Sequence, residues 1–209
     1  GHFALQHHGE EGKLYRFRNI RVKSMGEHAW TPIFDGESFD GWHARPGGEW
    51  KIEDGVLSGH NTEDDSRHGL MVTDEEYSDF TVRQKFQVEQ GNSGFYFRAE
   101  EVDDPVHIKG FQAEVEQADN VGGLYETAGR GWVVKPDPKV VEKAYKPDDW
   151  NQMTVSAHGK WIVVHLNGHK TAELKGDVGR MKGHLALQLH GNQNVTVRFK
   201  DIEMLKKKE

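Results

Sequence analysis

Apolar and polar residues alternate in the stretch Gly110-Phe111-Gln112-Ala113-Glu114-Val115-Glu116-Gln117-Ala118-Asp119. Successive side chains of a β-strand point to opposite faces, so this alternation predicts a strand that is buried on one side only. Phe111, Ala113 and Val115 are expected to face a hydrophobic core. The polar residues that alternate with them are expected to stand in a row on the other face of the strand.

Two carboxylates in that polar row are candidates for acid/base catalysis. Glu114 and Glu116 are two positions apart, which is about 6.5 to 7 Å along a strand, so both can reach one small ligand. Neighbouring carboxylates push each other's proton affinities apart, which suits an acid/base centre. Gln112 stands beside them. A solvated sheet face, on which charged side chains simply point into water, is the alternative that this strand by itself leaves open.

The composition favours one all-β domain. At 209 residues the chain is long enough for a single substantial core, and its apolar segments are short and bounded by turns. Gly is abundant, with 24 residues, and Pro is sparse, with 6, which is typical of many strands joined by tight turns. We therefore expect an antiparallel β-sandwich rather than a helical bundle.

The charge and the absent residue types argue against several functions. The formal net charge of −7 disfavours a nucleic-acid binder, because phosphate contacts need a basic surface. No apolar run is long enough for a transmembrane helix, so no membrane partner is expected. The chain has no cysteine, which excludes disulfides, thiolate nucleophiles and thiolate metal ligands.

Four predicted strands each carry an apolar face and a face of ligand-type groups. The polar faces are Tyr96 with Arg98, Gln112 with Glu114 and Glu116, His165 with Asn167, and Gln188 with His190. The inward residues of the last two strands are expected to be Ile162, Val164, Leu166, Leu185, Leu187 and Leu189. If the four strands belong to one curved sheet, their polar faces line a concave groove. Such convergence indicates a functional site more strongly than any single motif.

The first residues of the chain repeat its last strand pair. Residues 1–23 align without a gap with residues 183–205, so that Arg16-Phe17 falls on Arg198-Phe199. We interpret residues 1–25 as the closing β-hairpin of an upstream copy plus linker, with residues 26–31 reading as linker sequence, and residues 26–209 as the domain. Chance similarity between two hairpins is the alternative. An unpaired hairpin predicts a homodimer or a strand exchange through residues 1–25.

Several short motifs, taken together in their order and spacing, resemble the 3-keto-disaccharide hydrolase domain family, which is related in fold to concanavalin A-like lectins and glucanases. The motifs are Phe34-Asp35-Gly36 with Gly41-Trp42, Trp50 to Leu57, Asn92-Ser93-Gly94 with Phe97-Arg98, Gly110 to Val115, Gly123-Leu124-Tyr125, Arg130-Gly131-Trp132, Trp150-Asn151 and Leu166-Asn167-Gly168. The resemblance implies a two-sheet antiparallel jelly roll, concanavalin A-like, with a concave carbohydrate-binding face. It also implies a bacterial protein exported to the periplasm or the cell exterior, with a signal peptide that is not in this chain.

The resemblance further implies activity on glycosides that are already oxidised to a ketone at C3. Such a ketone acidifies the hydrogen at C2, so a carboxylate can remove that proton, the group at C1 can leave by elimination, and water can then add. Glu114 is the expected base, and Glu116 or a histidine the expected proton donor. Arg98, His165 or His190, or a metal held by such groups, is expected to stabilise the enolate.

Substrate contacts are expected from Tyr96, Gln112, Tyr125, Arg130, Asn167 and Gln188. Gln112 stands at the first of the alternate positions where the related glucanases place carboxylates, and an amide cannot be the nucleophile of a retaining glycosidase. A non-catalytic carbohydrate-binding module of a larger protein is the alternative function, although clustered carboxylates would be an unneeded desolvation cost for it. A scaffold domain is a third alternative.

A divalent metal ion is left undecided by the sequence, and no other cofactor is expected. His2, His8, His165, His184 and His190 could supply ligands, but no closely spaced motif such as His-Glu-x-x-His is present. Acidic pairs at residues 64–65, 103–104 and 148–149 could hold a structural calcium ion, which needs six or more oxygen ligands. Surface loops are the simpler interpretation of each pair.

Overall fold

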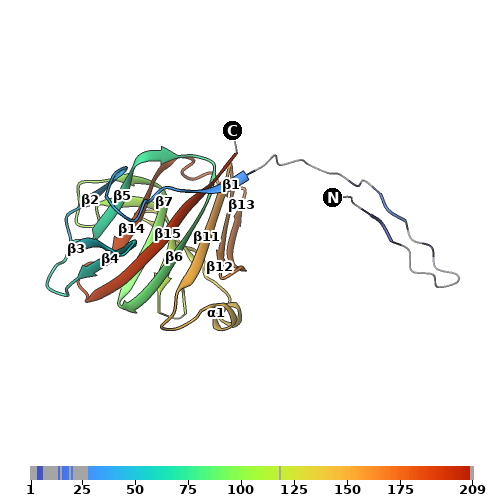
Figure 1. Ribbon diagram of the computed structural model, residues 1–209. Helices are drawn as coiled ribbons and strands as arrows, with labels where there is room; N and C mark the ends of the chain where they lie inside the picture. Colours follow the sequence, from blue (N-terminus) through green and yellow to red (C-terminus); the bar gives the residue numbers. More distant parts are fainter. Residues whose placement is uncertain are drawn as a thin grey trace.

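The computed structural model describes residues 4–6, 14, 16–18, 20, 28–117 and 119–207. Within these residues the chain forms fifteen strands and one short helix, α1 (Pro138–Ala144). The strands make two antiparallel sheets that pack face to face (Figure 1). This confirms the predicted all-β, two-sheet antiparallel jelly-roll sandwich. No helix within the described residues has the length and apolar character that crossing a bilayer requires.

The sheet that faces the reader in Figure 1 is called sheet A and has eight strands. Its order is β13 (His169–Lys175), β12 (Trp161–Leu166), β11 (Asn151–His158), β6 (Phe80–Gln90), β15 (Val195–Lys207), β4 (Val56–Asn61) and β3 (Glu49–Glu53), with β1 (His28–Pro32) paired to β15. The sheet behind it, sheet B, has the order β10 (Gly131–Val134), β9 (Leu124–Thr127), β8 (Ile108–Glu116), β7 (Asn92–Glu101), β14 (Gly183–Leu189), β5 (Gly69–Tyr77) and β2 (Trp42–Arg45).

The core lies between the two sheets and consists of the residues that the alternation predicts. Phe111, Ala113 and Val115 of β8 are fully buried there. The predicted inward residues of β12 and β14 join the same core: Ile162, Val164, Leu166, Leu185, Leu187 and Leu189. Each large apolar side chain contributes about 1.5 to 3 kcal/mol when it is fully buried. A slip of one residue in register would turn such a set to the outside, so the register is strongly specified.

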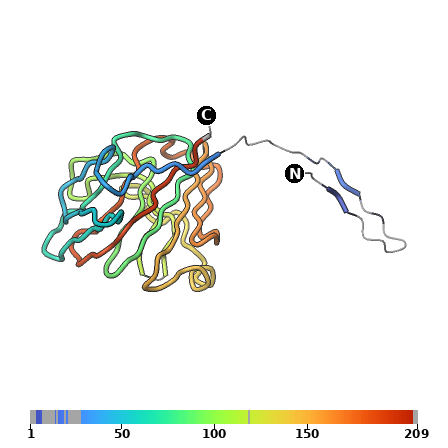
Figure 2. Tube along the Cα trace, viewed as in Figure 1, coloured from blue at the N-terminus to red at the C-terminus, as the bar shows by residue number. Residues whose placement is uncertain are grey.

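The chain enters the sandwich as a strand rather than as a linker. Residues 28–32 run antiparallel to the end of β15 (Figure 2), and in this pairing Trp30 stands opposite Leu205. The guanidinium of Arg83, on β6, lies 4.2 Å from the centroid of the Trp30 ring and helps to hold this strand on the sheet. The interpretation of residues 26–31 as a linker is therefore wrong from residue 28 onward. The predicted hairpin over residues 1–25 lies largely outside the described residues, so the upstream copy and the strand exchange stay predictions.

One polar side chain in the core is expected to lower the stability of the fold. Gln84 points inward from β6 and is 1% exposed, and neither polar atom of its amide has a hydrogen-bond partner among the described residues. A buried polar group without a partner costs about 1 to 3 kcal/mol. We therefore expect Gln84→Met, which keeps the side-chain length, to raise the free energy of unfolding by about 1 to 2 kcal/mol.

Urea denaturation of both proteins checks this expectation. Gln152→Met is the matched control, because Gln152 is half-buried on β11, where it alternates with inward residues, and its substitution should change stability by less than about 0.5 kcal/mol. A Gln84→Met protein that is no more stable than the original would mean that the amide is satisfied in solution.

Candidate functional site

A pocket of about 450 Å³ lies on the outer face of sheet B, which is turned away from sheet A. Its floor is made by side chains that alternate with the core residues of β7, β8 and β14. Its lining consists of His68, Asn92, Tyr96, Val106, Gln112, Glu114, Tyr125, Thr127, Trp132, Gln188, His190 and Gln193. The volume is typical of a site for a small molecule, for which about 300 to 1,000 Å³ is usual.

The strand register places the floor residues side by side. Tyr96 of β7 stands opposite Gln112 of β8, which in turn stands opposite Tyr125 of β9. Directly opposed residues of antiparallel strands have Cβ atoms about 4.5 to 5.5 Å apart, so their side chains interact. Gln188, on β14, reaches the same place from the far side of β7. The structure thus brings these four predicted substrate-binding residues together.

A closed ring of hydrogen bonds holds this floor. The Tyr96 hydroxyl lies 2.8 Å from the Thr127 hydroxyl, and the Thr127 hydroxyl donates to Oε1 of Gln112 at 3.3 Å. Nε2 of Gln112 donates to Oε1 of Gln188 at 3.3 Å. Nε2 of Gln188 donates to the Tyr96 hydroxyl at 3.2 Å. Because each group in the ring has a partner, the polar floor is oriented before any ligand arrives.

Glu114 is the carboxylate of the pocket. It is only 7% exposed, and it accepts hydrogen bonds from Nδ2 of Asn92 at 2.6 Å and from Nε2 of Gln112 at 3.3 Å. Burial raises the pKa of Glu114 to about 7, the charge of Glu116 adds to the rise, and the hydrogen bond from Asn92 opposes it. A carboxyl group that titrates near neutral pH is suited to take a proton from a substrate and to release it again.

Glu116 lies beside the pocket rather than in its lining. Nδ2 of Asn92 also donates to Oε2 of Glu116, at 3.3 Å, so one amide joins the two carboxylates. The other oxygen of Glu116 accepts hydrogen bonds from the backbone and the side-chain nitrogen of Asn120, each at 2.8 Å. The predicted pair of neighbouring carboxylates is therefore present, and Glu116 also anchors the turn that follows β8.

Two histidines with rings tilted by 46° to each other belong to the pocket lining. The rings of His68 and His190 have their centroids 4.3 Å apart. Nε2 of Gln188 lies 2.7 Å from Nδ1 of His68, and because an amide nitrogen only donates, Nδ1 accepts and the proton of the neutral ring is on Nε2. Burial, together with the charge of His190, lowers the pKa of His68 to about 4. His68 is therefore a neutral ring that carries one N–H donor at neutral pH.

His190 has its other nitrogen committed to the backbone. Its Nδ1 lies 2.7 Å from the carbonyl oxygen of Gly191, which can only accept, so Nδ1 carries the proton. Its Nε2 is the nitrogen that remains for a ligand. On another side of the pocket the rings of Tyr125 and Trp132 meet edge to face, with centroids 5.4 Å apart. The pocket thus combines a polar floor, two imidazoles and an aromatic wall.

Gly94 has no side chain, and the Gln112 amide of the pocket floor occupies the space that a Cβ atom there would take. A Cβ atom at Gly94 would lie 2.2 Å from Nε2 and 2.5 Å from Cδ of Gln112. We expect Gly94→Ala to push the Gln112 amide away from Glu114 and Gln188 and to lower ligand affinity or kcat/KM by about tenfold. A double-mutant cycle with Gln112→Ala checks the cause, because the two effects should not add. Equal effects of Gly94→Ala in both backgrounds would contradict this account.

Arg98 does not reach the pocket. Its backbone has φ of 47°, and the register between β7 and β8 shifts between Phe97 and Glu100, so a β-bulge ends the alternation that starts at Tyr96. The side chain is buried and donates to the carbonyl oxygens of Ser78 and Gly159 at 2.9 and 2.8 Å. The expectation that Arg98 lies on the polar face with Tyr96 is therefore wrong, because alternation cannot anticipate a bulge.

Three further predicted residues also lie elsewhere. Arg130 forms ion pairs with Glu126 and, at 2.7 Å, with Asp177. His165 lies on β12, which belongs to sheet A, and Nδ2 of Asn167, in the turn that follows, donates to the carbonyl oxygen of Ala144 at 2.8 Å. The prediction that all four polar faces line one groove is wrong for this strand. Alternation shows which residues share a face, but it does not show which sheet the strand joins.

Sequence reasoning missed half of the lining, namely His68, Asn92, Val106, Thr127, Trp132 and Gln193. Asn92 and Trp132 belong to motifs of the family resemblance, so they could have been proposed. His68 precedes β5 in a polar loop, where no periodicity marks it. Among the described residues, no group of three or more His, Asp or Glu side chains could hold a metal ion. A divalent metal ion therefore stays a prediction.

The fold and this pocket define a concanavalin A-like β-sandwich with a polar pocket on one outer sheet face. Residues 29–205 match the model of the 3-keto-alpha-glucoside-1,2-lyase-like domain, and the chain belongs to this family. The family suspected from the sequence motifs is thereby confirmed. A search of curated proteins finds no match to the sequence.

Solved structures with little sequence identity share the fold. A Parabacteroides distasonis protein provisionally described as a glycosyl hydrolase is 22% identical, with a TM-score of 0.61 over 86% of this chain and 94% of that one. The carbohydrate-binding module CBM66 of Bacillus subtilis is 14% identical, with a TM-score of 0.62 over 79% and 96%. A lichenase from a mouse hindgut metagenome is 13% identical, with a TM-score of 0.55 over 87% and 99%.

Proposed function

We propose that the protein is a carbohydrate-active enzyme that cleaves glycosides oxidised to a ketone at C3. The C2 proton passes to a carboxylate, and its electron pair forms an enolate with the C3 ketone. The enolate then expels the oxygen at C1, which takes up a proton, and a C1=C2 double bond remains. Addition of water across that bond gives the free 3-keto sugar, so the atoms of the whole reaction balance as hydrolysis.

The single observation that carries this proposal is the buried carboxyl group of Glu114 in the pocket lining. A base that removes a C2 proton works best when its pKa is near the working pH, and burial raises the pKa of Glu114 to about 7. We assign to Glu114 the removal of the C2 proton. Membership of the 3-keto-alpha-glucoside-1,2-lyase-like family supports the same reaction class.

The two histidines of the pocket are assigned the other two roles in the reaction, namely stabilising the enolate and protonating the leaving oxygen. The Nε2–H group of His68 is a neutral donor, and we assign it to the C3 oxygen, on which negative charge develops. His190 lines the pocket, whereas Glu116 does not, so we assign the proton of the leaving oxygen to the imidazolium form of His190, which carries a second N–H group on Nε2. The amides of Gln112 and Gln188 and the Tyr125–Trp132 wall would orient the sugar ring. Arg98 and His165 have no part in this scheme.

The test compares 4-nitrophenyl 3-keto-α-glucoside with the unoxidised glucoside, each with chelator and with added divalent metal ions. Release of nitrophenol from the keto substrate alone is the expected result. Run in heavy water and quenched early, the elimination route must place one deuterium at C2 of the product, because that carbon is protonated by solvent when water adds. Release of nitrophenol without deuterium at C2 would mean direct hydrolysis and would overturn the mechanism.

The alternative function is a non-catalytic carbohydrate-binding module, and one observation favours it. Aromatic rings and amides, here Tyr125, Trp132, Gln112 and Gln188, are sufficient to bind a neutral sugar without chemistry. The B. subtilis module CBM66 has the same fold. Saturable binding of both glucosides by calorimetry, without turnover of either under any metal condition, would establish this alternative. Export from the cell likewise remains a proposal that rests on the family.

A further inference from the structure

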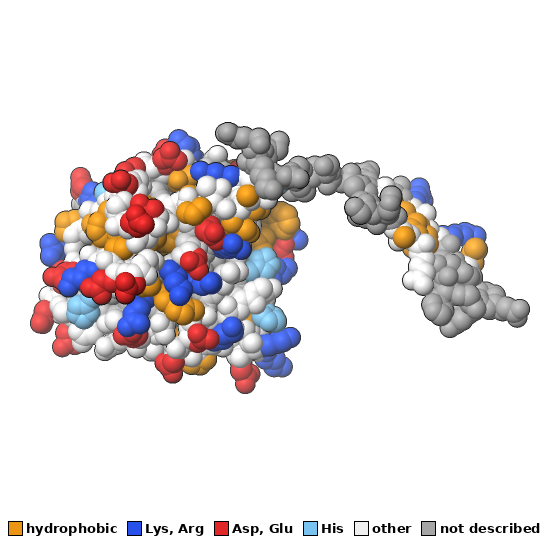
Figure 3. Space-filling model, viewed as in Figure 1, with side chains coloured by type: hydrophobic (Ala, Val, Ile, Leu, Met, Phe, Trp, Pro, Cys, Tyr) orange, Lys and Arg blue, Asp and Glu red, His pale blue; other side chains and the backbone are white. Residues whose placement is uncertain are grey.

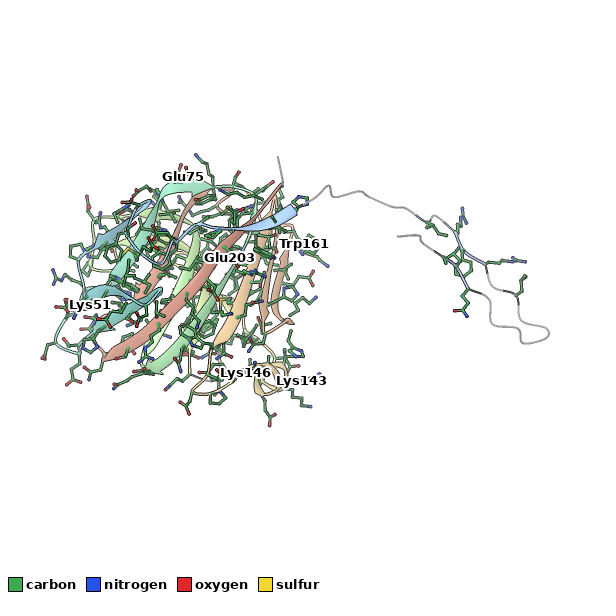
Figure 4. The ribbon with its side chains drawn as sticks, viewed as in Figure 1. Lys51, Glu75, Lys143, Lys146, Trp161 and Glu203 are labelled. Atoms are coloured by element: carbon green, nitrogen blue, oxygen red, sulfur yellow. The ribbon has the colours of Figure 1, made fainter. Side chains whose placement is uncertain are left out.

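A second cavity, of about 410 Å³, lies on the outer face of sheet A, on the opposite side of the sandwich from the pocket. It is built on the last strands of that sheet, β11, β12 and β13. Its lining includes Ser156, His158, Trp161, Val163, His165 and Glu173. Figure 4 labels Trp161 at this edge, and Figure 3 shows hydrophobic and histidine side chains close together there. The function proposed above makes no use of this cavity.

Trp161 is an exposed aromatic ring with a fixed orientation. Half of its surface is exposed, whereas a large apolar side chain is normally covered, and the Lys175 ammonium lies 5.9 Å from the centroid of its ring on one side. Its indole N–H donates to Oε1 of Glu173 at 3.0 Å. Glu173 is itself held by Lys175 at 3.0 Å and by Lys170. Because the ring is already oriented, the Trp161 side chain loses little conformational entropy when a ligand stacks on it.

Polar groups with spare hydrogen-bonding capacity surround the ring. Nε2 of His158 bonds to the Thr81 hydroxyl at 3.1 Å, which leaves Nδ1 for a ligand. The half-buried imidazole of His165 makes no hydrogen bond with any residue that the structure describes. Burial, with the charge of Lys170 beside it, lowers the pKa of His165, so this ring is neutral at neutral pH. The cavity wall therefore offers imidazole nitrogens of His158 and His165 to a ligand beside an aromatic face.

We propose that this cavity is a second carbohydrate-binding site, which takes one neutral sugar unit of an oligosaccharide. The apolar C–H face of a sugar ring would lie on Trp161, and its hydroxyl groups would bond to His158 and His165. Lys170 and Lys175 both form ion pairs with Glu173, and the one positive charge that this cluster leaves over is on solvent-exposed lysine side chains, where salt screens it, so it directs the site only weakly toward an anion. Since the two sites lie on opposite faces, a short sugar occupies one of them only, and a polymer held here keeps the domain near its substrate.

The test follows the indole N–H resonances of ¹⁵N-labelled protein, in which Trp161 and Trp132 are assigned by their Phe variants. The probes are cellotetraose and maltotetraose, added separately. We expect at least one of them to shift the Trp161 resonance saturably. Trp161→Ala should weaken this binding, followed on neighbouring backbone amides, by about tenfold or more, and His165→Ala by severalfold. Trp132→Ala, in the first pocket, is the matched control and should leave binding at Trp161 unchanged.

Two results would overturn the proposal. One is a Trp161 resonance that neither sugar moves at any concentration up to its solubility limit. The other is a concentration-dependent shift of Trp161 in the protein alone, which would mean that a second copy of the chain covers this face. Because the readout is binding at Trp161, it does not depend on turnover in the first pocket, and either site can fail without the other.

Discussion

Replacing Glu114 with glutamine is expected to lower the turnover of a 3-keto-glucoside by about 10² to 10⁴-fold and to make the folded protein more stable at pH 8. The first effect follows from the proposed role of Glu114 as the base. The second follows from its burial, because a carboxylate at this position loses hydration that its hydrogen bonds replace only in part. A residue that merely supports the fold would lower stability when it is changed.

The sign of the stability effect follows from the pKa. Burial raises the pKa of Glu114 to about 7 in the folded protein, from an ordinary value of 4.5. The folded state therefore binds the proton more tightly than the unfolded state. The stability that this tighter proton binding gives the folded state is fully present below about pH 4.5 and is lost as the pH rises through about 7. The loss in the free energy of unfolding is on the order of 3 kcal/mol. Glutamine stays neutral and does not incur this cost.

Urea denaturation of the original protein and of Glu114→Gln at several pH values measures this difference. The stability advantage of the variant should be near zero at pH 4.5 and should reach its full size at about pH 8. Glu116→Gln is the control, because Glu116 lies outside the lining and bonds to Asn120. It should show only a small part of this gain, because loss of its charge lowers the pKa of Glu114 while the larger cause, burial of the Glu114 carboxyl group, remains. A gain that is independent of pH would rule out the buried carboxyl group as its source.

The same pKa predicts the pH dependence of the reaction. If Glu114 is the base, kcat/KM for the 4-nitrophenyl substrate, whose leaving group needs no proton, should rise with pH and level off above about 7. The charge of Glu116 contributes to the raised pKa, so Glu116→Gln should move the midpoint of this profile to lower pH. A profile whose midpoint does not respond to Glu116→Gln would assign the titration to a group other than Glu114.

Replacing Arg98 with methionine is expected to destabilise the fold by about 3 to 5 kcal/mol, the largest loss of stability that we predict. The Arg98 side chain is 1% exposed and bonds to two turns, the one between β5 and β6 and the one between β11 and β12. It donates to the Ser78 and Gly159 carbonyl oxygens and, at 3.2 Å, to the carboxylate of Asp79. Methionine has a similar length but no donor, so the carbonyl oxygens of Ser78 and Gly159 would lose the partner that ties their two turns together.

Thermal and urea denaturation check this expectation. Arg198→Met is the control, because the Arg198 side chain is 43% exposed and its ion pair with Glu89 is at the surface, where such pairs contribute at most about 1 kcal/mol. Arg98 was expected from the sequence to stabilise an enolate. A variant at Arg98 that keeps its full stability but loses turnover would restore that catalytic role and would contradict the structural one.

The alternation of side chains was sufficient to predict the faces of the central strands. Phe111, Ala113 and Val115 are in the core, and Gln112 and Glu114 are on the opposite face. This succeeds because a strand has a local period of two, which the residues themselves report. The same reasoning fails at Arg98, where a bulge inserts a residue with positive φ and breaks the period.

The amino-acid order alone thus specified a sandwich of half-buried strands, its core residues and the row that contains Glu114, because these depend on contacts between neighbours in the chain. Only the tertiary structure decided which strands lie side by side, and therefore which rows of polar side chains form one site. It set β14 beside β7 and so joined Gln188 to Tyr96, and it placed β12 in the other sheet, so that His165 faces the opposite side. It also brought His68 and Trp132 to the pocket from loops and an edge strand. The physical reason is that strand order and loop position are set by packing between segments distant in the chain, which local periodicity does not encode.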